Sequence, residues 1–363
     1  MSIMQSLFGG MGGKDRALIG LDISSSAVKL VELAQRGNRF HVETYAIEPL
    51  PANAVADKQI LDAPAVGQTV ARALARSGAR TRQAAVAVSG ASVITKIIQM
   101  PESLSELDLE EQIKVEADQY IPYSIDQVAL DFQVLGPGAA GSGTVDVLLA
   151  GCRKEDVETR CATLELAELQ PKVVDIEANA LQNAALFLQH QMKDGGRDKT
   201  IALVDMGCTN TSILVLQNLQ PVYTRDSGFG SRQLLDDMMR YYGMTLEEAT
   251  QARRFHNEPE GFDLEVLAPF VSDMGQQIDR SLQFFFASSS QHAQIDQIIL
   301  AGGCATIPDA ARTLTDQLQI PVVVAEPFAG MSVSAKARPT QLAADAAALL
   351  IACGLAYRAF DPG

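Results

Sequence analysis

The sequence has no long hydrophobic run and no basic region at its N-terminus. The longest apolar run near the C-terminal end, residues 346–356, is about half of the roughly 20 residues that a membrane-spanning helix requires. Residues 1–14 contain a short apolar patch followed by glycines, and lack the basic start of a secretory signal peptide. We therefore expect a chain that does not cross a membrane by itself.

Basic residues and closely spaced cysteines are also scarce. The chain has 29 Lys and Arg against 44 Asp and Glu, a net charge of -15, which argues against binding to nucleic acid or to an anionic membrane surface. Its five cysteines are odd in number and contain no C-x-x-C pair. This pattern favours reduced thiols in the cytoplasm over disulfides or a zinc site.

What the sequence does contain is ordinary for a soluble globular protein. Apolar residues make up 47% and charged residues 20% of the 363 residues, enough for a large core. This length fits two domains of about 150–200 residues each.

A hairpin pattern with an acid at the strand end lies at residues 201–216. An apolar run ends at Asp205, a turn follows with Gly207, Thr209, Asn210 and Thr211, and a second apolar run leads away. Glycine lets backbone amides approach a ligand closely, and hydroxyls donate to phosphate oxygens. An acid in a phosphate-binding turn requires a cation, so Asp205 is predicted to face Mg²⁺, directly or through water. The alternative is an ordinary hairpin with a polar turn.

The same pattern occurs at residues 17–33, where a strand ends at Asp22 and is followed by Ser24, Ser25 and Ser26. Two such units predict two related halves that face one ligand. A third element, residues 298–306, is an apolar strand that ends at Gly302 and Gly303, where backbone can pack against a flat ligand or a phosphate.

Two further places combine a strand or turn with the start of a helix. In residues 225–237, Gly228 and Gly230 precede a helix N-terminus, whose amides can bind an anion. Glu177 stands where a strand becomes a helix. Its carboxylate either orients an attacking water or caps its own helix, and the sequence leaves both interpretations open.

The pattern of predicted strands and helices changes between residues 89 and 172. The pattern there is strand–helix–strand–strand–helix–strand, with Ser105 and Asp108 spaced as a helix cap, and it predicts a compact α+β subdomain inserted into the first half. Such an insertion is either a packing element or a docking module. We favour docking.

Four motifs in order resemble those of the actin-like ATPase superfamily. They are I-G-L-D-I-S-S-S-A-V-K-L-V-E-L, V-D-I-E-A-N-A-L, L-V-D-M-G-C-T-N-T-S-I and I-I-L-A-G-G-C-A-T-I-P-D, which look like its phosphate-1, connecting, phosphate-2 and adenosine motifs. The insertion resembles that of the division protein FtsA. The first of these motifs, E-A-D-Q-Y-I-P-Y and I-P-V-V-V-A-E-P-F are similar to the PilM family of type IV pilus proteins. The resemblance covers nearly the whole chain.

This resemblance implies an α/β, actin-like (ribonuclease H-like) bilobed fold with an inserted α+β subdomain of the FtsA 1C type. The expected division is a flexible segment at residues 1–14, a first lobe (1A) at residues 15–88 and 173–197, the insertion at residues 89–172, and a second lobe (2A/2B) at residues 198–363.

The function that the resemblance implies is that of an ATP-binding scaffold in the cytoplasm, held at the inner membrane through a partner. Family members bind the N-terminal cytoplasmic tail of PilN in a groove between the first lobe and its insertion. They help to form the PilM–PilN–PilO–PilP complex for pilus biogenesis and twitching motility. Pilus motor ATPases and a homo-oligomer are further implied partners. The alternatives are a sugar or acyl kinase of the same fold and an FtsA-like division filament.

The resemblance also implies roles for individual residues. Asp22 and Asp205 would be the acids on the Mg²⁺ side, and Glu177 the water-orienting residue. The ATP-binding set is Asp22, Ser24, Ser25, Ser26, Lys29, Asp205, Gly207, Thr209, Asn210, Thr211, Gly228, Gly230, Arg253, Gly302 and Gly303.

Three positions depart from the family pattern. Ser24 stands where glycine is usual, and Thr250 and Arg253 replace a Glu and a Lys that relatives direct at the nucleoside. Arginine keeps the charge of lysine but not its geometry. We therefore expect ATP binding of altered affinity, with at most slow hydrolysis.

Overall fold

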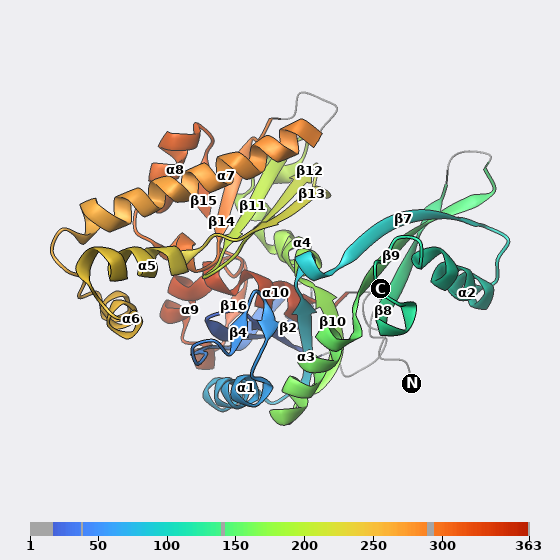
Figure 1. Ribbon diagram of the computed structural model, residues 1–363, viewed down its shortest axis with the longest axis horizontal. Coiled ribbons are helices and arrows are strands. Elements are labelled where there is room, and N and C mark those ends of the chain that lie inside the picture. The colour runs from blue at the N-terminus through green and yellow to red at the C-terminus, as the bar shows by residue number, and fades with distance from the viewer. Residues whose placement is uncertain (1–16, 38, 139–141, 289–293, 362–363) are drawn as a thin grey trace.

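The computed structural model describes residues 17–37, 39–138, 142–288 and 294–361. They form two lobes side by side and an inserted subdomain that projects from the first lobe (Figure 1). The predicted flexible segment at residues 1–14 lies outside the described residues.

The first lobe is built on a six-stranded sheet in the order β10-β6-β1-β2-β3-β16. Its strands are β1 (Ile19–Ile23), β2 (Ala27–Arg36), β3 (Arg39–Pro49), β6 (Gln83–Val88), β10 (Gln170–Ile176) and β16 (Ser332–Val333). β1, β2 and β3 are antiparallel neighbours, whereas β6 pairs with β1 in parallel. The helices α1 (Ala63–Ser77) and α3 (Lys154–Leu166) share one buried cluster with this sheet.

The second lobe repeats this arrangement in a five-stranded sheet in the order β13-β12-β11-β14-β15. Its strands are β11 (Thr200–Met206), β12 (Thr211–Gln217), β13 (Gln220–Ser227), β14 (Gln297–Ala301) and β15 (Val322–Val324). Three antiparallel strands are again followed by a parallel neighbour, here β14 beside β11. The two lobes therefore have corresponding strands, with Asp22 on β1 and Asp205 on β11.

The remaining helices cover the second sheet, connect the lobes or, as α9 and α10 do, pack against β2 and β3 of the first sheet. They are α4 (Glu177–Leu188), α5 (Ser231–Tyr242), α6 (Leu246–Phe255), a π-helical turn (Asp263–Leu267), α7 (Ala268–Ser288), α8 (Ala310–Leu318), α9 (Pro339–Asp345) and α10 (Leu350–Tyr357). The C-terminal region consists of α9, a 3₁₀ turn (Ala346–Leu349) and α10.

Within the described residues, one helical stretch, Pro339–Tyr357, is long and apolar enough to cross a membrane, by length and composition only. Of the apolar part of this stretch, 61% is buried inside the fold. There, α10 packs in hydrophobic clusters together with residues of β2 and α4. A buried core helix can have the same length and composition, and this stretch packs as a core helix.

The insertion contains β7 (Ile94–Pro101), α2 (Glu106–Ala117), β8 (Val128–Pro137) and β9 (Thr144–Arg153). Its antiparallel sheet has the order β7-β9-β8, and α2 covers one face around Ile98, Met100, Ile113 and Leu149. Ser105 caps α2, as predicted, because its hydroxyl accepts from the Asp108 amide at 3.3 Å. The last strand of the predicted pattern, β10, pairs with β6 of the first lobe instead.

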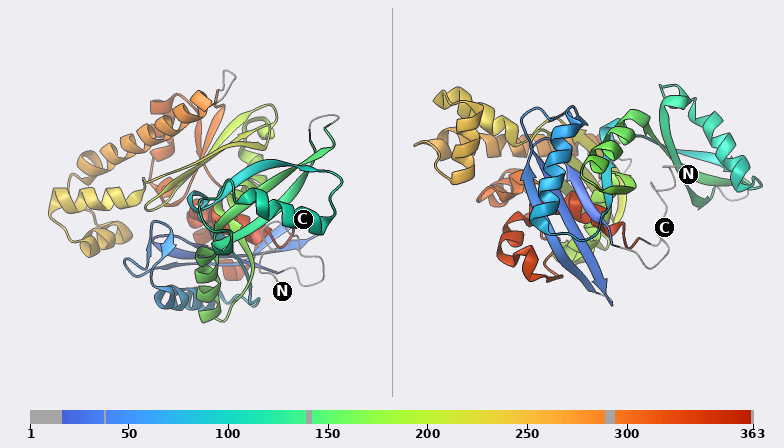
Figure 2. Two further views of the ribbon diagram at one scale, coloured as in Figure 1. Left: turned by 45° about the vertical axis from the view of Figure 1, so that its right-hand side comes forward. Right: turned by 90° about the horizontal axis from the view of Figure 1, so that it is seen from below.

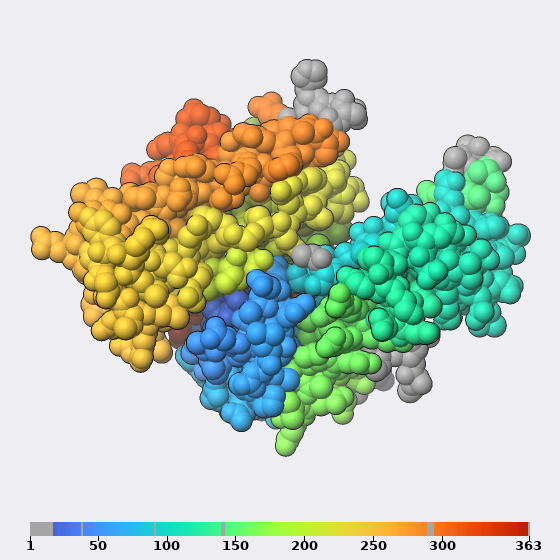
Figure 3. All heavy atoms as spheres, viewed as in Figure 1, coloured from blue at the N-terminus to red at the C-terminus, as the bar shows by residue number. Residues whose placement is uncertain are grey.

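The insertion stands apart from the rest of the molecule except at its base (Figures 2 and 3). At this base, Ala129 of β8 and Ala150 and Cys152 of β9 join the first-lobe cluster together with α3. The distal part has its own small core. The insertion is therefore anchored in the first lobe through β8, β9 and α3.

Candidate functional site

The turn between β1 and β2 places an acid and a base side by side. Asp22 and Lys29 are directly opposite in the antiparallel register, and their side chains form an ion pair of 3.0 Å between Nζ and Oδ2. Burial alone would lower the pKa of Lys29, but Asp22 and then Asp205 outweigh this effect and raise it. Lys29 therefore stays charged between acids from both lobes.

Asp205 is the counterpart in the second lobe. Burial raises its pKa to about 6, against the opposing effect of Lys29, and Asp22 adds to the rise. Lys58 also lowers this pKa and Asp226 raises it, so the carboxylates around Asp205 outnumber the two ammonium groups and the site favours an additional cation.

Mg²⁺ fits this arrangement. Within the described residues no three His, Cys, Asp or Glu side chains converge as metal ligands. Mg²⁺ commonly uses only one or two protein carboxylates and takes its other ligands from phosphates and water. Asp22 and Asp205 are the residues that could hold it.

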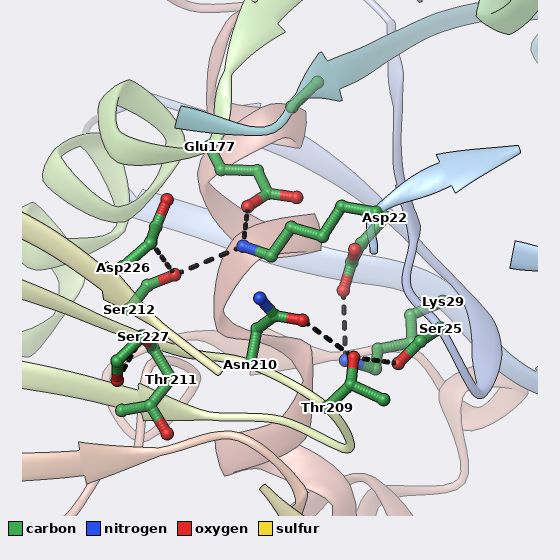
Figure 4. Close-up of polar contacts among 12 residues, drawn as sticks. Asp22, Ser25, Lys29, Glu177, Thr209, Asn210, Thr211, Ser212, Asp226 and Ser227 are labelled. Carbon is green, nitrogen blue, oxygen red and sulfur yellow. Dashed lines mark hydrogen bonds and ion pairs between the residues drawn. The ribbon is translucent and has the colours of Figure 1, made fainter. Parts of the chain in front are cut away.

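The two turns that were predicted to bind phosphate meet between the lobes. Thr209 Oγ1 lies 3.0 Å from Ser25 Oγ and donates to Asn210 Oδ1 at 2.7 Å (Figure 4). The predicted hydroxyl residues of the two halves are therefore neighbours. Ser24, in contrast, donates its hydroxyl to the Ala27 carbonyl within its own turn at 2.9 Å. Thr211 donates to the Phe229 carbonyl at 2.8 Å.

Gly302 occupies a position that excludes every side chain. Its φ is +83°, and a Cβ there would lie 2.3 Å from the Met206 carbonyl oxygen and 2.7 Å from Asp205 Oδ1. Gly303 differs, because a Cβ on it would meet nothing within 4 Å. Gly302 thus allows β14 to approach the acid on β11, and Gly303 borders open space.

The start of α5 supports the turn between β11 and β12. The Ser231 amide donates to the Gly207 carbonyl at 3.0 Å, and the Arg232 amide donates to the Cys208 carbonyl at 2.7 Å. A Cβ on Gly230 would lie 2.4 Å from the Cys208 carbonyl oxygen. Gly230 therefore lets the helix approach the turn, while direct contact of Gly228 or Gly230 with a ligand stays a prediction.

The structure adds three residues that the sequence did not single out. Lys58 Nζ lies 2.5 Å from Glu177 Oε2 and donates to Ser212 Oγ at 3.3 Å. Ser212 in turn donates to Asp226 Oδ1 at 2.6 Å. Burial raises the pKa of Glu177, although Lys58 opposes the rise. In Figure 4, dashed lines connect this series of contacts from Glu177 to Ser212 and Asp226. Because Glu177 precedes β11 in the chain and Ser212 lies on β12, the series joins the two lobes.

Lys58 could not have been found from a motif. It lies in the turn between β4 (Val55–Ala56) and β5 (Gln59–Ile60), a hairpin whose strands are only two residues long. Its partner Glu177 was predicted to orient water or to cap α4. The contact with Lys58 directs Glu177 toward the interlobe space.

Arg253, predicted to face the nucleoside, pairs with Glu258 and lies over the Phe262 ring at 5.2 Å. Its neighbours Thr250 and Arg254 line a cavity of about 310 Å³ between α6 and the first lobe. The Thr250 hydroxyl donates to the Leu246 carbonyl within α6 at 2.7 Å. Of the two arginines of α6, Arg254 therefore lines this cavity, whereas Arg253 is held by Glu258.

Paired lobes with an acid on corresponding strands define the class of actin-like ATPase folds. The chain is similar to the ethanolamine utilization protein EutJ from Carboxydothermus hydrogenoformans, with a TM-score of 0.55, 17% identity, and 96% of this chain and 92% of that chain covered. It is similar to MreB5 of Spiroplasma citri bound to AMPPNP, with a TM-score of 0.50, 12% identity, and 94% and 95% covered. These likenesses confirm the predicted fold.

Residues 20–360 match the family model described as type IV pilus assembly protein PilM, and the chain belongs to this family. It is also similar to a chain of a PilM–PilN type IV pilus biogenesis complex, with a TM-score of 0.78 and 27% identity over 95% of this chain and 99% of that chain. The family assignment confirms the resemblance and a function in type IV pilus assembly. It does not favour the kinase or the division filament.

Proposed function

We propose that this chain is a scaffold of type IV pilus assembly that binds Mg²⁺-ATP between its lobes and the N-terminal tail of PilN at its insertion. The observation that carries the nucleotide part is the convergence of Asp22, Lys29 and Asp205 with the hydroxyls of Ser25 and Thr209. These residues come from both lobes. A ligand bound by both would stabilise one arrangement of the lobes over others.

The chemistry of this site favours binding over rapid turnover. Asp22 and Asp205 would hold Mg²⁺, which neutralises phosphate charge when bound. Lys29 and the hydroxyls of Ser25 and Thr209 would contact phosphates, and Gly303 would lie against the adenosine. Glu177 is paired with Lys58, which competes with its use as a base for water. Hydrolysis is accordingly expected to be slow.

Cys208 provides a direct test of nucleotide binding. It lies in the second phosphate turn, and it is not buried, whereas Cys152, Cys161, Cys304 and Cys353 are. We expect one thiol of the native protein to react quickly with an aromatic disulfide reagent. Mg²⁺-ATP at ten times its Kd should slow this reaction about tenfold, because only the free fraction reacts.

The matched control is Cys208→Ser, which should lose the fast thiol and keep the slow ones. Unchanged labelling of Cys208 at saturating Mg²⁺-ATP would contradict binding at this turn. If several thiols react equally fast without nucleotide, the fold has opened. Circular dichroism would check this.

The insertion offers a surface for the peptide. One face of its sheet is covered by α2, whereas Ile97 of β7, 57% exposed, and Leu135 of β8, 50% exposed, point to the other face. Ile97 and Gln133 both pair with Leu148 of β9, so these side chains form a row across the sheet. In Figure 2, α2 lies on the outer side of this sheet.

An extended peptide can use such a row of side chains, or add a strand to β7 or β8, which are both edge strands. The relative whose structure is titled a PilM–PilN complex supports PilN as the partner. Through PilN, the chain would join PilO and PilP in the inner-membrane complex. Its place would then be the cytoplasmic side of that membrane.

We expect the synthetic N-terminal tail of PilN to bind the full chain in isothermal titration. Ile97→Glu should weaken this binding about tenfold or more, because it places a charge in an apolar contact. Leu107→Glu is the matched control, since Leu107 is 76% exposed on α2 on the covered side of the sheet. Equal effects of the two substitutions, or no heat with the wild type, would contradict this site.

A further inference from the structure

Arg160 on α3 is a buried charged residue whose hydrogen bonds go to the backbone. Only 5% of the residue is exposed. Nε donates to the Ala87 carbonyl at 2.7 Å, Nη1 to the Asp156 carbonyl at 3.0 Å and Nη2 to the Lys58 carbonyl at 2.9 Å. One side chain therefore holds together α3, β6 and the turn of the β4–β5 hairpin.

The turn that Arg160 holds is the one that carries Lys58. Asp57 and Lys58 both have left-handed backbone conformations, with φ of 48° and 61°. Such conformations are unfavourable for residues other than glycine and persist where the surroundings fix them. The hydrogen bond from Arg160 fixes the Lys58 backbone, and the Lys58 side chain then reaches Glu177 and Ser212 in the interlobe space.

The helix of Arg160 is also joined to the insertion without a loop. β9 ends at Arg153, and α3 begins at Lys154. Lys154 Nζ donates to the Asp126 carbonyl just before β8, at 2.6 Å. β9 is the central strand of the inserted sheet, so a displacement of that sheet reaches α3 directly.

We propose that Arg160 is a positioning residue that makes the place of Lys58 depend on the insertion, and thereby couples the peptide surface to the nucleotide site. Peptide docking shifts β9 and α3, Arg160 carries the shift to the β4–β5 turn, and Lys58 moves relative to Glu177 and Ser212. Coupling of this kind requires that each ligand prefers one of the two arrangements, and it is reciprocal. The proposal rests on the proposed nucleotide and peptide sites.

A double-mutant cycle tests whether Arg160 acts through Lys58. Mg²⁺-ATP affinity is measured by titration for the wild type, Arg160→Met, Lys58→Met and the double variant. We expect each single substitution to weaken binding about tenfold, and the double variant to bind no more weakly than Lys58→Met. If the double variant loses affinity by the product of the two single factors, Arg160 acts independently of Lys58, and the proposal is overturned.

A second readout needs no nucleotide. The rate at which acetic anhydride modifies the Lys58 amine is measured by mass spectrometry, with Lys29 of the same molecule as the reference. Arg160→Met should raise the rate at Lys58 severalfold and leave Lys29 unchanged, because the contacts of Lys29 do not involve Arg160. Equal changes at both lysines, or no change, would mean a general structural role and would contradict positioning.

The third measurement is the coupling itself. Saturating PilN-tail peptide should change the Mg²⁺-ATP affinity of the wild type by about fivefold or more, and this change should disappear in Arg160→Met. Coupling that persists in Arg160→Met would overturn the proposal. If the wild type binds neither ligand, the proposed function fails, whereas the acetylation rates still decide whether Arg160 positions Lys58.

Discussion

Replacing Asp205 with asparagine is expected to abolish measurable Mg²⁺-ATP binding while the fold stays intact. Asparagine has nearly the same shape, but it removes the charge that faces Lys29 and, when present, Mg²⁺. We expect a loss of affinity of about 100-fold or more, which corresponds to roughly 3 kcal/mol. Isothermal titration with Mg²⁺-ATP measures it.

The same substitution should stabilise the nucleotide-free protein at neutral and higher pH. The pKa of Asp205 in the folded protein is about 6, above the ordinary value of 3.8. A raised acid pKa contributes stability that is fully present below the unfolded value and is lost as pH rises through the folded value. At pH 8 the wild type therefore carries the full cost of a buried carboxylate, and Asp205→Asn does not.

We expect Asp205→Asn to unfold at a higher urea concentration than the wild type at pH 8, with a gain of about 1–3 kcal/mol. This gain should shrink between pH 6 and pH 4, where the wild type becomes protonated. Glu43→Gln is the control, because Glu43 lies in the exposed ion pair with Arg36. Tight Mg²⁺-ATP binding by Asp205→Asn, or equal pH profiles for all three proteins, would contradict the role assigned to Asp205.

The two adjacent glycines at the end of β14 should respond in opposite ways to alanine. Gly302→Ala places a Cβ against the Met206 carbonyl in a left-handed backbone, and should destabilise the fold by about 3 kcal/mol or more. Gly303→Ala meets no neighbour, so its free energy of unfolding should stay within about 0.5 kcal/mol of the wild type.

The same two substitutions distinguish an effect on folding from an effect on nucleotide binding. If adenosine lies against Gly303, Gly303→Ala should weaken Mg²⁺-ATP binding about tenfold without a change in thermal unfolding, because the added methyl fills space that the ligand uses. Thermal unfolding and titration of both variants measure this. Unchanged affinity in Gly303→Ala would show that the adenosine does not contact this glycine. A Gly302→Ala variant as stable as the wild type would contradict the close packing of Gly302 against Met206.

Local patterns were sufficient to predict most strands and helices. The two apolar runs of residues 201–216 form β11 and β12, and the cap at Ser105 begins α2. Each of these elements follows from periodicity and capping within a few residues. Residues 220–227 were not predicted as a strand. Their side chains are mostly not buried, so β13 lacks the apolar signal of the strands beside it.

The repeated acid-and-turn pattern also predicted which loops carry the site. Asp22 and Asp205 occupy corresponding strands, and Ser25 lies beside Thr209 because both turns are at the same end of their sheets. A motif of this kind is readable because the acid, the turn and the returning strand are contiguous in the chain.

The two halves, the insertion within the first half and the acids at the strand ends were predictable from the sequence, because each is encoded by neighbouring residues. The contact of Glu177 with Lys58, 119 positions away, and the hydrogen bond of Arg160 to the Lys58 carbonyl, 102 positions away, became visible only in the folded structure. The folded structure also showed that Arg254, and not Arg253, lines the cavity beside α6. Such contacts depend on how separate elements pack, which local periodicity does not record.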